Sequence, residues 1–347
     1  MSRLSGEFEK QRAMVILFPS RTDVWRGECR PIREIMVELA NIVAEFQEVI
    51  IGVLPELRET LETEYVLDDR VKVVEMQYND CWARDTVSSV VTGEKPYIAA
   101  FRFNAYGAGL YKPWDDDDEL DYVFAKEFGY DVKDSPITLE GGNICSDGNG
   151  TLFAVREAIV NDNRNPGMSL EEIEEGLKDI LCLEQIVWIE RGLLADETGG
   201  HIDNIMAFAD KTTIVLSWTD DVNNPQYELV REIEAKIKSC SNVDGEKYNI
   251  VHLPVPNLYR RTKEDSDSIV TTEDSFPREE GDYVLETYVN FALANGVVVV
   301  PQFGNDLDAE AVRILKEVFS DRKVIPLRGR EASLGGGGFH CLTKHIN

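Results

Sequence analysis

Short runs of β-branched residues alternate with longer amphipathic stretches along the whole chain. The runs have the length and composition of buried strands, and the longer stretches repeat apolar residues at helical spacing. A chain in which strands and helices alternate folds as an α/β protein. The expected strands are Val49 to Val53, Val71 to Val74, Ser88 to Val91, Thr213 to Ser217 and Val297 to Val300, and the expected helices are Ile32 to Glu48, Leu120 to Phe128, Leu170 to Ile180, Tyr227 to Lys238 and Asp308 to Phe319.

No Pro-, Gly- or Ser-rich linker divides the 347 residues. The longest irregular polar stretch, Arg260 to Gly281, lies between elements that continue one pattern. Hydrophobic residues make up 43% of the sequence, which is enough for a sizeable core and excludes a disordered chain. We therefore expect a single catalytic domain over residues 1–347.

The formal net charge of -28 argues against nucleic acid and anionic membranes as partners, because both require a basic contact face. It suits a small cationic ligand, although an acidic surface can also serve solubility alone. The apolar run near the N-terminus is too short for a signal peptide, and no stretch approaches a membrane span. A cytoplasmic location is the expectation. Six scattered cysteines without C-x-x-C spacing predict free thiols, with neither a zinc site nor disulfides.

Four glycine-rich or turn-forming segments carry ionisable residues and are candidates for functional loops. They are Asn79 to Asp85, Leu139 to Asn143, Glu197 to Asn204 and Leu334 to Cys341. If His201-Ile202-Asp203 is extended, its histidine and aspartate point the same way and could combine an acid/base with a cation anchor. A structural hydrogen bond is the alternative for this pair. Only four histidines are available, and the one at position 252 has a strong structural interpretation.

Cys341 follows four consecutive glycines close to the C-terminus, where such flexibility suits a backbone that bends around a ligand. This makes it the first candidate for a nucleophile, ahead of Cys81 and Cys145. A small buried hydrophobic residue is the alternative.

Taken together, these segments resemble the agmatine deiminase family over nearly the whole chain. The motifs that carry the resemblance are Asn79-Asp80-Cys81-Trp82-Ala83-Arg84-Asp85-Thr86, Phe103-Asn104-Ala105-Tyr106-Gly107, Lys112-Pro113-Trp114-Asp115, Glu140-Gly141-Gly142, Asn163-Arg164-Asn165-Pro166, Gly200-His201-Ile202-Asp203-Asn204, Leu216-Ser217-Trp218-Thr219-Asp220-Asp221, Asn223-Asn224-Pro225-Gln226-Tyr227, Tyr288-Val289-Asn290-Phe291, Val300-Pro301-Gln302-Phe303-Gly304 and His340-Cys341.

The resemblance implies the pentein fold, a five-bladed α/β propeller with pseudo-fivefold symmetry, although the sequence has no convincing internal repeat. It implies hydrolysis of agmatine to N-carbamoylputrescine and ammonia through a covalent amidino-thioether, without a metal or organic cofactor. A homo-oligomer, most simply a dimer, is also expected.

The resemblance also implies the roles of individual residues. Cys341 is the nucleophile and His201 the acid/base, while Asp85 and Asp203 anchor the guanidinium in bidentate geometry. Glu140 is a further carboxylate for substrate contact or proton handling, and Asp203 is counted with the catalytic group. Trp82 lines the substrate channel, where a cation-π contact is possible, although core packing is the more common role of a tryptophan.

The chain departs from the family pattern in four places: Val87-Ser88, Cys145, Ala154 to Ala158, and Gly338 where asparagine is usual. These departures leave the proposed catalytic residues in place and concern substrate identity. A peptidylarginine or free-arginine deiminase remains the nearest alternative, in which Arg84, Arg164 or Arg330 would bind a substrate carboxylate. A non-catalytic cation-binding protein is the alternative from another class.

Overall fold

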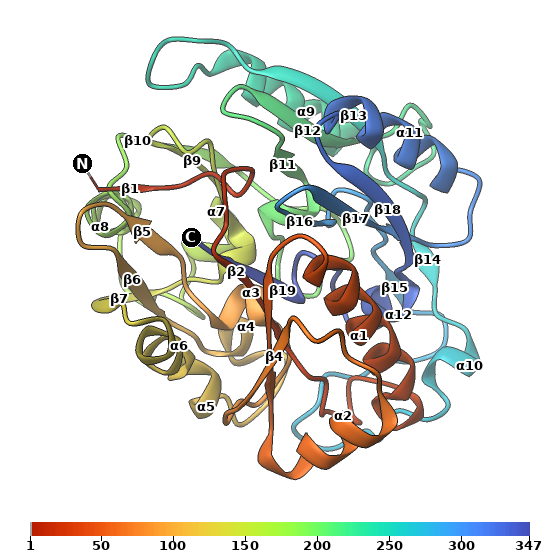
Figure 1. Cartoon of the computed structure of the whole chain (residues 1–347). Helices are drawn as coiled ribbons and strands as arrows, with labels where there is room; N and C mark the ends of the chain where they lie inside the picture. Colours follow the sequence, from red (N-terminus) through yellow and green to blue (C-terminus); the bar gives the residue numbers. More distant parts are fainter. Residues whose placement is uncertain (1) are drawn as a thin grey trace.

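The computed structural model describes residues 2–347, and one arrangement of strands occurs five times in it. A short strand pairs antiparallel with a central strand, a helix follows, and a third strand pairs parallel with the central one. The helix supplies the crossover that two parallel neighbours need. Five such units confirm the expected α/β propeller, and the sheets lie around a common centre with the long helices outside (Figure 1).

The first unit joins the two ends of the chain. The C-terminal strand β19 (Thr343–Ile346) pairs antiparallel with β2 (Ala13–Leu17), and β2 pairs parallel with β3 (Glu48–Val53). The helix between β2 and β3 is α1 (Arg30–Ala44), and α2 (Arg58–Glu64) leads to the outer strand β4 (Val71–Glu75). Closure through β19 fixes the segment just before it, which contains Cys341, at the centre of the molecule (Figure 1).

The other four units follow in chain order. The second has β5 (Val90–Thr92), β6 (Tyr97–Arg102), α6 (Leu120–Phe128) and β7 (Asp131–Thr138), with β1 (Arg3–Leu4) at its edge; the third has β8 (Ile144–Ser146), β9 (Thr151–Val155), α8 (Leu170–Leu181) and β10 (Gln185–Ile189). The fourth has β11 (Met206–Phe208), β12 (Thr213–Trp218), α9 (Tyr227–Ser239) and β13 (Asn249–Pro254); the fifth has β16 (Ala292–Ala294), β17 (Val297–Gln302), α11 (Asp308–Val318) and β18 (Lys323–Arg328).

Smaller elements lie within the units or connect them. They are the hairpin β14 (Tyr259–Arg260) with β15 (Tyr283–Val284), the short helices α3 (Ala83–Thr86), α4 (Ala105–Ala108), α5 (Asp115–Asp118), α7 (Arg156–Ile159), α10 (Lys263–Ser266) and α12 (Arg330–Leu334), and the 3-10 turns η1 (Gly27–Cys29), η2 (Pro55–Leu57), η3 (Gly141–Asn143) and η4 (Ile202–Asn204).

Most of the expected elements occur within a residue or two of the predicted bounds, and the capping box of Ser169 and Glu172 is present at the start of α8. The helix predicted over Ile32 to Glu48 is too long, because α1 ends at Ala44 and Glu48 already begins β3. A 3-10 turn in which Phe46 N donates to the Val43 carbonyl ends the helix. The strand predicted at Ser88 begins at Val90.

Candidate active site

Five buried side chains occupy equivalent positions in the five units, each just before the first strand of its unit. Because the units surround one centre, these five positions meet there (Figure 1). Every side chain in the set is 5% exposed or less. The residues are Asp85 before β5, Glu140 before β8, Asp203 before β11, Asn290 before β16 and Cys341 before β19.

The Cys341 thiol lies between a carboxylate and an amide. Its Sγ is 3.3 Å from Asp203 Oδ2, and Asn290 Nδ2 donates to Sγ at 3.1 Å. The Asn290 Oδ1 also accepts from the backbone N of Cys341 at 3.2 Å. Burial raises the pKa of the Cys341 thiol well above its ordinary value, and the negative charges of Asp203 and Asp85 raise it further. The resting group is therefore a neutral thiol.

His201 lies at the N-terminal end of η4, between two carboxylates. Its Nδ1 is 3.8 Å from Asp85 Oδ1 and its Nε2 is 3.8 Å from Glu140 Oε2, too far for hydrogen bonds but close enough for charge attraction. Burial opposes a charge on the ring, yet the carboxylates of Asp85 and Glu140 outweigh it and raise the pKa of His201 to about 9. At neutral pH the ring is an imidazolium that can donate a proton.

Hydrogen-bonding capacity at the centre of the site is unused. Among residues 2–347, both ring nitrogens of His201, Glu140 Oε2 and Asp203 Oδ1 are buried without a hydrogen-bond partner. Buried polar atoms in folded proteins are nearly always paired, so such a group calls for an explanation. The two carboxylate oxygens can accept from the N–H groups of a planar cation, and the imidazolium ring can donate a proton to a group that leaves.

Neighbouring groups fix the carboxylates of Asp85 and Glu140. Tyr106 Oη and the backbone N of Gly142 donate to Asp85 at 2.8 and 2.7 Å, and Arg164 Nε donates to Glu140 at 2.7 Å. Burial opposes the charge of Glu140, but Arg164 and His201 overcome this and lower the pKa of its carboxyl group. Burial raises the pKa of Asp85, with His201 acting against it. These contacts hold the carboxylates in one orientation each.

Glycine is required at two positions where backbone approaches the site. A Cβ at Gly142 would lie 2.7 Å from His201 Nδ1 and 2.8 Å from Asp85 Oδ1, within the space that the unpaired atoms face. A Cβ at Gly337 would lie 3.1 Å from Cys341 Sγ and 2.7 Å from the Trp82 ring. The glycine run before Cys341 therefore permits close packing around the thiol.

A narrow cavity of about 370 Å³ leads to the thiol and is called the Trp82 cavity here. Its walls include an aromatic side, in which the Trp82 ring packs on Trp25 with centroids 5.4 Å apart. Its charged side includes the carboxylates of Asp80 and Glu197. Arg278 also lines it, but this guanidinium donates to Glu197 Oε2 at 2.6 Å and to the Gly335 carbonyl.

The structure brings together all six residues predicted for the site: Trp82, Asp85, Glu140, His201, Asp203 and Cys341. The extended arrangement considered for His201 to Asp203 holds only for His201, because Ile202 to Asn204 form the turn η4, beside which Asp196 accepts from the His201 backbone N and Asn204 Nδ2. Within the acidic run Asp115 to Glu119, Asp117 is buried and accepts from the backbone N of Asn79, which begins the Asn79 to Asp85 segment.

Sequence reasoning missed Asn290 and Tyr106 as site residues, although both lie in quoted motifs. A buried asparagine within the apolar run Tyr288 to Leu293 was the available signal. Gly338 packs against this asparagine, because a Cβ there would lie 2.4 Å from Asn290 Oδ1. Cys145 lies outside the Trp82 cavity and lines a second one, described below.

The chain matches the family model of Porphyromonas-type peptidyl-arginine deiminases over residues 3–346. It is 34% identical to an agmatine deiminase of Pseudomonas aeruginosa over 352 residues, covering 99% of this chain and 94% of the other. The chain belongs to the agmatine deiminase family.

Solved structures agree with this assignment. The agmatine deiminase of Enterococcus faecalis superposes with a TM-score of 0.95 at 30% identity, over 99% of this chain and 95% of the other. A Campylobacter jejuni agmatine deiminase, at 23% identity and a TM-score of 0.84, shares the fold. The protein is therefore a hydrolase that acts on the C–N bond of a guanidino group.

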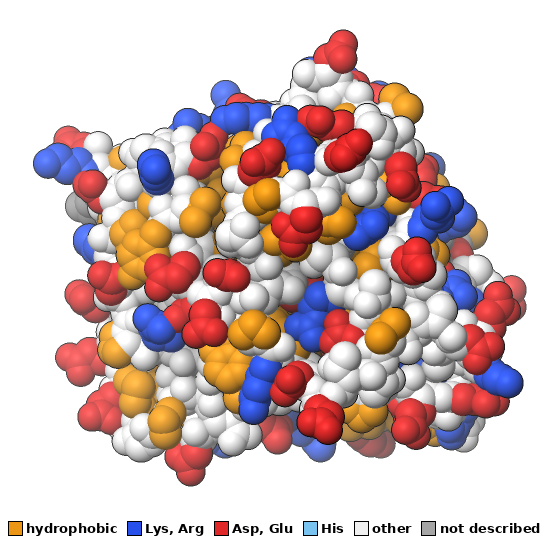
Figure 2. Space-filling model, turned by 90° about the horizontal axis from the view of Figure 1, so that it is seen from below, with side chains coloured by type: hydrophobic (Ala, Val, Ile, Leu, Met, Phe, Trp, Pro, Cys, Tyr) orange, Lys and Arg blue, Asp and Glu red, His pale blue; other side chains and the backbone are white. Residues whose placement is uncertain are grey.

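Two further observations concern possible partners. Acidic side chains are spread over the face in Figure 2, and the lysines and arginines there form no continuous basic area. Within residues 2–347, no group of three or more His, Cys, Asp or Glu side chains could hold a metal ion, and no helix is long and apolar enough to cross a membrane.

Proposed function

We propose that the protein hydrolyses agmatine to N-carbamoylputrescine and ammonia, with Cys341 as nucleophile and His201 as acid and base. The observation that carries this proposal is the pair of unpaired buried carboxylate oxygens, Glu140 Oε2 and Asp203 Oδ1, which can accept from the N–H groups of a guanidinium, with Asp203 in contact with the Cys341 thiol. Asp85 and Asp203 would hold the planar cation in place, so that Cys341 can attack its central carbon from one face.

The first half-reaction forms a covalent intermediate. When the cation binds, the Cys341 thiol releases its proton to solvent, and Sγ, as thiolate, adds to the guanidinium carbon and gives a tetrahedral adduct. The protonated His201 ring donates its proton to the departing nitrogen, which leaves as ammonia while the C–N bond breaks. An amidino-thioether on Cys341 and a neutral His201 remain. A ring with a pKa of about 9 is charged at neutral pH and so begins this step in the required state.

The second half-reaction consumes one water. Neutral His201 takes a proton from the water, and the hydroxide adds to the amidino carbon. The adduct collapses with cleavage of the C–S bond, and its hydroxyl proton passes to the leaving sulfur, so that the neutral Cys341 thiol and the ureido product form. His201 is again protonated at the end. One residue thus serves as acid in the first step and as base in the second.

The Trp82 cavity favours agmatine over arginine. Agmatine carries an ammonium at the end opposite its guanidinium, and the carboxylates of Asp80 and Glu197 line the cavity that leads to Cys341. An α-carboxylate would need an available cation, but Arg278 is paired with Glu197. The other candidate arginines, Arg84, Arg164 and Arg330, do not line this cavity and contact Glu7, Glu140 and Glu286.

Ammonia release from agmatine, free arginine and an arginine peptide tests the proposal directly. We expect release from agmatine, with kcat/KM for arginine lower by about 10³-fold or more, because an unpaired carboxylate would be buried among carboxylates. Equal or preferred release from arginine or the peptide would move the protein to the alternative deiminase activity. No release from any of the three would favour a cation-binding protein.

A bound guanidinium should make Cys341 more acidic. The carboxylates of Asp203 and Asp85 raise the pKa of the empty-site thiol, and a cation between them offsets that charge. The thiolate absorbance of wild type minus that of Cys341→Ala, titrated with pH, should therefore show a midpoint at lower pH when an alkylguanidinium that is not turned over is present. An unchanged midpoint at saturating ligand would contradict this prediction.

A further inference from the structure

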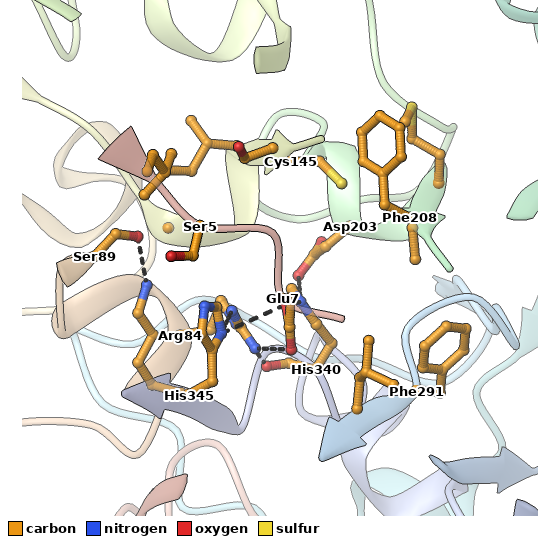
Figure 3. A pocket seen from close by; sticks show the side chains of 18 of the residues that line it. Ser5, Glu7, Arg84, Ser89, Cys145, Asp203, Phe208, Phe291, His340 and His345 are labelled. Carbon is orange, nitrogen blue, oxygen red and sulfur yellow. Dashed lines mark hydrogen bonds and ion pairs between the residues drawn. The ribbon is translucent and has the colours of Figure 1, made fainter. Parts of the chain in front are cut away.

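A second cavity adjoins the catalytic residues, and its lining includes Glu7, Arg84, Cys145, Asp203 and His340 (Figure 3). It is called the Glu7 cavity here. Asp203 contributes to its wall, whereas Cys341 contributes to the wall of the Trp82 cavity. Asp203 and Cys341 are in contact, so the two cavities lie on either side of this pair.

His340 bridges two carboxylates in this cavity. Its Nδ1 is 2.9 Å from Asp203 Oδ2, and its Nε2 is 2.8 Å from Glu7 Oε2 (Figure 3). A neutral imidazole has one N–H and one acceptor nitrogen, and an ionised carboxylate only accepts. Two such contacts from one ring therefore require both nitrogens to carry protons. The geometry favours an imidazolium at position 340.

The groups around His340 support this charge state. Burial and the nearby Arg84 oppose a charge on the ring, but Glu7 and Asp203 outweigh them and raise the pKa of His340. Glu7 also accepts from Arg84 Nη2 at 2.9 Å, and its pKa lies well below the ordinary value despite burial, because Arg84 and His340 are close. His345, with Nδ1 3.6 Å from Glu7 Oε2, has its pKa lowered to about 3 by burial and is neutral.

Lys344 is a further titratable group near this network. Its Nζ is buried and donates to Ser89 Oγ at 3.1 Å, and burial together with Arg84 lowers its pKa to about 7. Within this network His340 is the cation in direct contact with Asp203 Oδ2, the oxygen that also faces the Cys341 thiol.

We propose that His340 is a positioning residue, an imidazolium fixed between Glu7 and Asp203 that orients Asp203 toward Cys341 and offsets part of its negative charge. Two roles are combined in one contact. The Nδ1–H bond selects one orientation of the Asp203 carboxylate, and the positive charge lowers the cost of forming a thiolate beside it. Glu7, from the segment between β1 and β2, holds the other side of the ring. The proposal rests on the proposed function where turnover is the readout.

Nitrogen-15 NMR of histidine-labelled protein tests the charge state without substrate. The chain has four histidines, which simplifies assignment by single variants. We expect His340 to lose its second ring proton at a pH above the ordinary histidine midpoint of about 6.5, with the signals removed in His340→Gln. His201, with a pKa of about 9, should give a second imidazolium that disappears in His201→Gln. A His340 midpoint at or below the ordinary value would overturn the proposal.

Glu7→Gln tests the second contact. The neutral amide removes a negative charge at 2.8 Å from Nε2, so the protonation midpoint of His340 should fall by about one pH unit or more. The matched comparison is His252→Gln, whose ring stacks on Trp218 and pairs with Glu234 outside both cavities, and which should leave this midpoint unchanged. An unchanged midpoint in Glu7→Gln would also overturn the proposal.

The effect on the nucleophile is measured with His340→Gln. The midpoint of the Cys341 thiolate titration should rise by about one pH unit, and kcat on agmatine should fall about 10- to 100-fold through misplacement of Asp203. A thiolate midpoint equal to that of wild type would contradict the role. The NMR and thiolate results do not depend on agmatine, so they can support His340 even if agmatine proves not to be the substrate.

Discussion

Cys341→Ala is expected to abolish ammonia release from agmatine, with a loss of about 10⁵-fold or more in kcat, as for the removal of other enzymatic nucleophiles. The physical reason is the absence of a second thiol that could replace it, because the Trp82 cavity is lined by Cys341 and by no other cysteine in the described part of the chain. The measurement is ammonia release under saturating agmatine.

Binding should survive this substitution. Asp85, Glu140 and Asp203 take their orientation from Tyr106, Arg164 and His340, none of which depends on the thiol. Agmatine should therefore still raise the melting temperature of the Cys341→Ala protein. Cys240→Ala, at the end of α9, serves as the matched control and should keep full activity. Substantial turnover by Cys341→Ala would exclude covalent catalysis at this residue.

His201→Gln is expected to lower kcat by about 10³- to 10⁴-fold, because both half-reactions lose their proton carrier. Binding of the substrate should not be weakened. The substitution removes a buried positive charge 3.8 Å from both Asp85 and Glu140, so the site becomes more attractive to a cation. We therefore expect KM for agmatine to stay the same or to fall.

Mass spectrometry of the quenched reaction adds a second readout for this variant. If some amidino-thioether still forms, its hydrolysis lacks a base, and the adduct on Cys341 should accumulate during turnover. A variant with normal kcat and a raised KM would contradict the assigned role and would make His201 a binding residue instead.

The α/β class could be predicted from the sequence because it depends on local patterns. The helix over Leu120–Phe128 was predicted with its observed bounds, and the helix predicted over Leu170 to Ile180 ends one residue before α8 does. The fivefold repeat could not be detected in this way. Each unit keeps the pairing pattern of its strands, but Cys341, Asn290 and Asp203 stand at equivalent positions with unlike side chains.

The local conformation of the loops was predicted less well than the meeting of their residues at one site. His201 and Asp203 would share one side of the chain if the segment were extended, yet only His201 is extended, and Asp203 lies in the 3-10 turn η4 beside Asp196. Side-chain hydrogen bonds of this kind depend on residues whose partners cannot be identified from spacing alone. The two residues nevertheless meet at the site, because the unit that carries them places the turn at the centre.

The sequence by itself determined the fold class and the family and supplied the candidates for the reacting groups, since these follow from residue types, their periodicity and ordered motifs. The tertiary structure decided which charges face one another. The contact of Asn290 with the thiol, the pairing of Arg278 with Glu197 and the position of His340 between two carboxylates each join segments that are far apart in the chain. Electrostatic energy depends on distance and burial, and the closed propeller fixes both.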